Sequence, residues 1–206
     1  MPESKKSFLE NMLEFLENNH NFITIIHLFG VALGLGGATI NDFLFFRFLK
    51  DNKISRWEAR IMRMFHGVIW LAILILILSG FGIYLPEAEK LNNSPKFLIK
   101  MITDAVIIIN GIFLNAIISP KLIYISFRKR RPHHPEFRYL TCFAFALGAI
   151  SLTSWYWAFF LGMLRKTELA FSILLSLYVL FLITAVGFSQ LAESYFRRRG
   201  KSKNND

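Results

Sequence analysis

Long apolar stretches alternate with short charged segments along almost the whole chain. Five of these stretches are long enough to cross a bilayer, whose hydrocarbon core of about 30 Å requires about 20 helical residues. The sequence therefore predicts an all-α integral membrane protein: a five-transmembrane antiparallel helix bundle forming one polytopic domain over residues 1–206. The predicted spans are residues 22–48, 61–85, 97–125, 139–164 and 169–195.

The segment before the first span has a different pattern. Apolar residues between Phe8 and Leu16 recur at helical spacing among acidic and polar ones. This periodicity predicts a short amphipathic helix over Ser7–Glu17, within a surface segment of residues 1–20 that lies on the membrane rather than across it.

Positive charge is concentrated on one side of the predicted bundle. The chain has 24 lysines and arginines and a net charge of +10, and most of these residues fall in segments 47–63, 121–138 and 197–203. The positive-inside rule then predicts an outside N-terminus, a cytoplasmic C-terminus and a cytoplasmic basic tail at 197–206. We expect the cytoplasmic loops to contact anionic lipids, and this placement of charge argues against nucleic acid as a partner.

Polar residues inside the spans are costly in a membrane and usually face the bundle interior. In the first span, one helical face carries a histidine followed by small residues: His27, Gly30, Gly34, Gly37 and Asn41. Such a face lets another helix, a flat ligand or a second copy of the chain approach the backbone closely. The pattern leaves helix packing, a bound cofactor and a homodimer contact open.

The third and fourth spans add polar and aromatic groups at a similar depth. Lys100 and Asp104 are one turn apart and can pair. Trp155, in the outer half of the fourth span, either packs in the core or flanks a ring. His27, Lys100, Asp104 and Trp155 are therefore predicted to share the outer leaflet. A histidine and a neutral lysine at one depth can ligate a haem iron, with Asp104 bonded to the free ring nitrogen of His27.

The remaining histidines belong elsewhere. His66 lies on the order of 20 Å from His27 along the membrane normal, so the two cannot hold one iron. It serves a second, inner site with Asn41 or Asp42, or it is a packed or interfacial residue. His133 and His134 lie in a basic loop, where a solvated role is the alternative to metal binding. The chain has no Cys-x-x-Cys-His motif, so any haem would be non-covalent.

Several short motifs resemble one group of small bacterial membrane proteins. That group includes the HemJ-type protoporphyrinogen oxidases, the membrane domain of copper resistance D proteins and uncharacterised relatives. The motifs are His27 with Gly34 and Arg47, residues 58–63 (EARIMR), residues 80–82 (GFG) and residues 97–101 (FLIKM).

The resemblance implies a bacterial inner-membrane protein with b-type haem served by a first-helix histidine and a third-helix lysine, which match His27 and Lys100. The chain departs from the HemJ-type pattern at Gly34-Leu35-Gly36, where those proteins usually carry a tryptophan, and in its fifth span. Oxidase activity is therefore not carried over.

Two functions from different classes follow. The first is a haem-binding membrane protein in redox or porphyrin metabolism, which as an enzyme would be a haem-dependent oxidoreductase. Its expected site is His27 and Lys100 as ligands, with Asp104, Gly30, Gly34 and Trp155 around them. The second is a small carrier or assembly protein without a cofactor, in which the same polar groups are structural.

Overall fold

The computed structural model describes residues 3–49, 56–118, 121, 135–164 and 169–202. The regular elements within these residues are all helical. In chain order they are α1 (Glu3–Asn18), α2 (His20–Leu49), α3 (Arg56–Tyr84), α4 (Ala88–Asn92), α5 (Pro95–Phe113), the π-helix η1 (Leu114–Ile118), α7 (Pro135–Met163) and α8 (Phe171–Ser202).

Five helices of the described part are long and apolar enough to cross a membrane, which confirms the predicted number of spans. They are His20–Phe45, Trp57–Tyr84, Pro95–Ile118, Tyr139–Met163 and Phe171–Tyr195. The third span differs from the continuous helix predicted over 97–125, because its regular α-helix ends at Phe113 and continues as η1. The rest of that segment, and the His133–His134 loop, lie outside the described residues.

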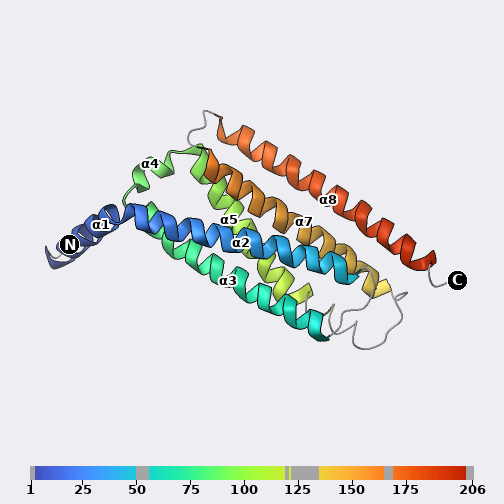
Figure 1. The fold of residues 1–206 in the computed structure, drawn as a ribbon. Coiled ribbons are helices and arrows are strands. Elements are labelled where there is room, and N and C mark those ends of the chain that lie inside the picture. Colours follow the sequence, from blue (N-terminus) through green and yellow to red (C-terminus); the bar gives the residue numbers. More distant parts are fainter. Residues whose placement is uncertain (1–2, 50–55, 119–120, 122–134, 165–168, 203–206) are drawn as a thin grey trace.

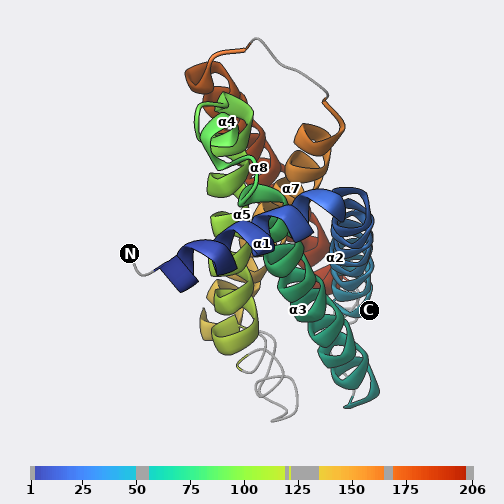
Figure 2. The ribbon, with the colours of Figure 1, turned by 90° about the vertical axis from the view of Figure 1, so that its left-hand side faces the viewer.

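Successive spanning helices run in opposite directions (Figure 1). The helices α1 and α4 lie at one end of the bundle, where α2 begins and α3 ends, and we call this the α4 end. The opposite end carries Arg47, Arg60, Arg63 and Lys121 and is called the basic end. The amphipathic helix α1 turns away from the direction of α2 (Figure 2). It covers the predicted segment Ser7–Glu17.

Glycines bring α2 and α3 close together. A Cβ atom on Gly30 would lie 3.0 Å from Cγ2 of Ile75, and one on Gly37 would lie 3.1 Å from Cγ1 of Ile69. Small residues thus permit van der Waals packing of the two helices, which is what drives helix association in lipid.

On the other side of the bundle, α8 lies beside α7 and α5. Trp157 and Tyr178 stack with ring centroids 5.9 Å apart, and Ile99, Leu161 and Leu174 complete this buried cluster. The outward face of α8 is apolar and exposed: Ile183, Phe188 and Leu191 are 66%, 69% and 66% exposed. Large apolar side chains pointing outward on such helices are what a lipid-facing surface requires.

Candidate functional site

His27 of α2 and Lys100 of α5 meet in the half of the bundle nearer the α4 end. Nζ of Lys100 lies 3.3 Å from Nε2 of His27, although the two residues are 73 positions apart in the chain. Both side chains are half-buried. The pairing suggested by their common depth is thus present as a direct contact between two nitrogen atoms.

A third helix orients the histidine. Nδ1 of His27 lies 3.0 Å from Oγ of Ser79 on α3, and this hydroxyl donates to the carbonyl of Ile75 at 2.6 Å. Since the serine proton is used there, Oγ accepts from Nδ1–H, and Nε2 presents its lone pair to Lys100. A directional series of hydrogen bonds thus runs through Lys100, His27 and Ser79. We call this hydrogen-bond series the outer chain.

Ser79 was not predicted from the sequence, which suggested Asp104 as the partner of the free ring nitrogen of His27. In the structure Asp104 lies one turn beyond Lys100 on α5. The expected contact between Asp104 and His27 is therefore replaced by Ser79. The sequence offered one signal, the small residue Gly80 next to Ser79. In the structure, a Cβ on Gly80 would lie 3.7 Å from Cε1 of His27.

The glycine face of α2 is filled by the protein itself. Gly30 faces Ile75 and Leu76, and a Cβ on Gly34 would lie 2.2 Å from Cη2 of Trp155. Trp155 is 3% exposed and belongs to a core cluster. Of the alternatives left open, helix and ring packing occupies this face. In the structure, Gly30 and Gly34 therefore serve the packing of α2 against α3 and against Trp155.

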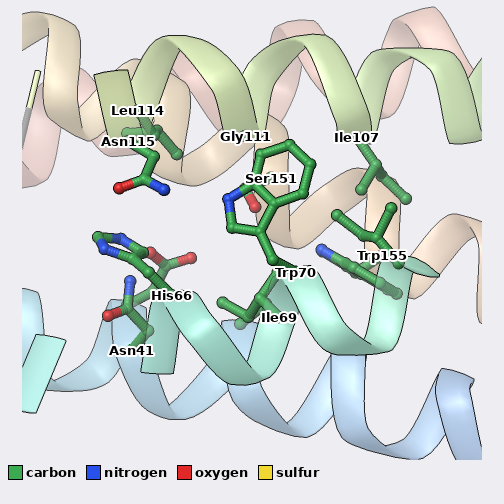
Figure 3. Close-up of a pocket in the computed structure, with 13 residues that line it drawn as sticks. Asn41, His66, Ile69, Trp70, Ile107, Gly111, Leu114, Asn115, Ser151 and Trp155 are labelled. Carbon is green, nitrogen blue, oxygen red and sulfur yellow. The ribbon is translucent and has the colours of Figure 1, made fainter. Parts of the chain in front are cut away.

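A second polar site lies in the half of the bundle nearer the basic end. It is a pocket of about 40 Å³ between α2, α3, α5, η1 and α7. Figure 3 shows Asn41, His66 and Asn115 turned toward one another at one side of it. Asp42 and Ser151 also line it. The structure thus brings His66 together with both residues suggested for an inner site, and we call this the inner pocket.

Several polar atoms around the inner pocket have no hydrogen-bond partner. Within the described residues these include Oδ1 of Asn41, Oδ2 of Asp42 and Nδ1 of His66. Asn41 and Asp42 are only 9% and 7% exposed. Buried polar groups are nearly always paired in folded proteins, so unpaired ones point to an unseen ligand or to water.

An apolar layer separates the two polar sites. On each of α2, α3 and α5 a core residue stands between them: Ala38, Ile73 and Ile107, joined by Trp155 from α7. His27 and Asn41 are 14 residues apart on α2, which corresponds to about 21 Å of helix. The expectation that His27 and His66 cannot share one metal ion agrees with this separation.

The donor atoms of the outer chain fit a haem iron in kind. A histidine with its second ring nitrogen held by a hydrogen bond is the usual form of a metal-bound histidine. His27 and Lys100 are the residues that would hold the iron, and their nitrogens lie 3.3 Å apart in direct contact with each other.

Comparisons with known proteins do not identify a function for this site. Neither protein-family models, nor curated proteins, nor solved structures match this chain. The described residues also hold no group of three or more His, Cys, Asp or Glu side chains suited to a metal ion.

Proposed function

We propose that this multi-pass membrane protein binds b-type haem between His27 and Lys100. The observation that carries the proposal is the meeting of His27 Nε2 and Lys100 Nζ across two helices. Haem at this position would supply one-electron redox chemistry, in electron transfer or porphyrin metabolism.

The residues of this chain have distinct tasks in that proposal. Ser79 fixes the tautomer and orientation of His27, so that Nε2 is available as a ligand. Lys100 would ligate the iron only through a neutral amine, so its contact with His27 would have to change from a hydrogen bond to a shared metal ion.

The test is the absorption spectrum of the purified protein, air-oxidised and then reduced with dithionite, from cells supplied with a haem precursor. We expect a Soret band that shifts on reduction at near-stoichiometric haem. His27→Ala should abolish haem retention while the protein still inserts, and His66→Ala should retain it as the matched control. Full occupancy in His27→Ala would remove His27 as a ligand.

A second function is favoured by a different observation. The outer chain is already hydrogen-bonded, and the glycine face is filled by α3 and Trp155. These facts favour a carrier or assembly protein without cofactor, in which Lys100 and His27 are structural. A colourless protein with intact helicity would select this function over the haem proposal.

We also propose the orientation and location of the bundle. The basic end faces the cytoplasm and anionic lipid headgroups, with the N-terminus outside, in a bacterial inner membrane. A cysteine at Asn93, in a variant with Cys142 replaced by alanine, should react with an impermeant maleimide added to intact cells. Labelling at Asn93 only after the cells are opened would reverse the orientation.

A further inference from the structure

The inner pocket is polar on one side and apolar on the other. Figure 3 shows the amide and imidazole side chains of Asn41, His66 and Asn115 at one side, with Ile107 and Trp155 at the other. Five helical segments line it, and Oδ1 of Asn41, Oδ2 of Asp42 and Nδ1 of His66 are buried from solvent there without a hydrogen-bond partner. Whatever satisfies these atoms must be held inside the pocket.

The volume limits what the pocket takes. About 40 Å³ accommodates one ion with a water molecule. It is far below the roughly 300 Å³ at which organic ligand sites begin. A porphyrin or a metabolite is therefore excluded from this pocket as it stands.

The donor set indicates the chemistry of the occupant. Asp42, Asn41, Asn115 and Ser151 offer carboxylate, amide and hydroxyl oxygens, which are hard ligands suited to hard cations. Transition metals favour sets richer in imidazole and thiolate. The oxygens of this pocket thus favour an alkali or alkaline-earth ion.

Charge balance decides between one and two positive charges. The pocket lining contains one carboxylate, that of Asp42 on α2. The facing residues from the other segments are the titratable His66 of α3 and the neutral Asn115 of η1 and Ser151 of α7. One monovalent cation would neutralise Asp42, whereas a divalent ion would leave a net buried charge in the membrane, which is strongly unfavourable.

The backbone at Asn115 departs from an ordinary helix. Asn115 is the second residue of the π-helix Leu114–Ile118, which directly follows the regular helix α5. Such segments are rare and occur frequently at functional sites, because the wider turn changes where the side chains point. Here it accompanies the side chain that faces Asn41 and His66 across the pocket.

We propose that the inner pocket is a sodium site, in which the Asp42 carboxylate neutralises one Na⁺ and the oxygens of Asn41, Asn115 and Ser151 complete its coordination. The site satisfies the unpaired oxygens of Asn41 and Asp42. His66 bonds the water that accompanies the ion. This site is independent of the haem proposal, because the apolar layer separates it from the outer chain.

The experiment is equilibrium binding of radioactive ²²Na⁺ to the detergent-purified full chain, with choline chloride maintaining ionic strength. We expect saturable binding of one ion per chain, and a melting temperature that rises with sodium concentration because the ion binds only the folded protein. Asp42→Asn should abolish both effects. Asn115→Ala should weaken binding by about tenfold or more, because it removes one of the proposed ligands, and loss of even an outer-shell group costs that much.

The matched control is Glu193→Gln, a buried carboxyl on α8 that does not line the pocket. This variant should bind sodium as the wild type does. Absence of saturable binding in the wild type would overturn the proposal, as would unchanged binding in a folded Asn115→Ala protein. A melting temperature that responds to pH through Asp42 but not to sodium would assign the pocket to a proton and overturn the sodium assignment.

Discussion

Helices α2, α3 and α5 contribute to both the outer chain and the inner pocket, but the two sites differ in how their polar atoms are satisfied. In the outer chain, Lys100, His27 and Ser79 pass one hydrogen bond to the next and end on a backbone carbonyl. In the inner pocket, atoms of Asn41, Asp42 and His66 have no partner. The first arrangement is complete without a ligand, whereas the second needs an occupant.

This difference matters because the polar groups of both sites are buried or half-buried. A satisfied polar network in a low-dielectric interior rigidifies the fold, and an unsatisfied one is costly. The outer chain therefore has to be opened before it can hold a metal, while the inner pocket gains by binding one.

The largest loss of stability is expected from a substitution against Trp155, in the apolar layer between the two sites. Gly34→Ala would put a Cβ 2.2 Å from Cη2 of Trp155, whose ring cannot move without disturbing the apolar layer. We expect a loss of about 3 kcal/mol in the free energy of unfolding, typical of severe overpacking. Unfolding in mixed SDS and detergent micelles would measure it.

The control for this variant is Gly36→Ala, two positions along the same helix, where an added Cβ meets nothing within 4 Å. It should be neutral or stabilising by up to about 1 kcal/mol, since alanine is the better helix former. Equal losses in the two variants would show that helix backbone effects, and not the Trp155 contact, are being measured.

A smaller loss of stability is expected when the outer chain is interrupted by a substitution in the haem-free protein. Lys100→Met leaves Nε2 of His27 without a donor, which should cost about 1–3 kcal/mol. In a double-mutant cycle with His27→Leu, the two losses should be non-additive by about 0.5 kcal/mol or more. Strict additivity would mean that the two nitrogens do not interact in the membrane.

Removing a polar side chain from the inner pocket should not reduce the free energy of unfolding, in contrast to Lys100→Met. In sodium-free buffer, Asn41→Leu removes an unpaired buried acceptor, so unfolding free energy should stay unchanged or rise. Adding sodium should stabilise the wild type but not this variant. A loss as large as that of Lys100→Met would show that Asn41 has a partner even without sodium.

The smallest effect concerns an ion pair outside the spans. Nζ of Lys90 lies 2.8 Å from Oε2 of Glu87, and both side chains are exposed. The hydrogen bond from Lys90 lowers the pKa of Glu87, so its contribution is present above the ordinary pKa of glutamate and is lost as pH falls through the lowered value. Lys90→Ala should therefore cost less than about 1 kcal/mol at neutral pH. A larger loss in thermal unfolding would show that α4 is coupled to the bundle.

Much of the architecture follows from the sequence because lipid imposes length and polarity on each span. The five spans, the helix before them and the common depth of His27 and Lys100 were all predictable from apolar runs and helical rise. The glycine face was ambiguous, since close approach by a helix and by a ligand require the same small residues. In the structure this face is used for packing, with Trp155 against Gly34 and α3 against Gly30.

What the sequence determined alone is the membrane class and which polar groups share a depth, because hydropathy and rise per residue act along one helix. Which of those groups are in contact depends on the packing of the helices. Ser79 replaced Asp104 at His27, and Asp42 joined His66 in one pocket beside a π-helix. These choices depend on how each helix is rotated about its axis, and that rotation results from packing against neighbours distant in sequence.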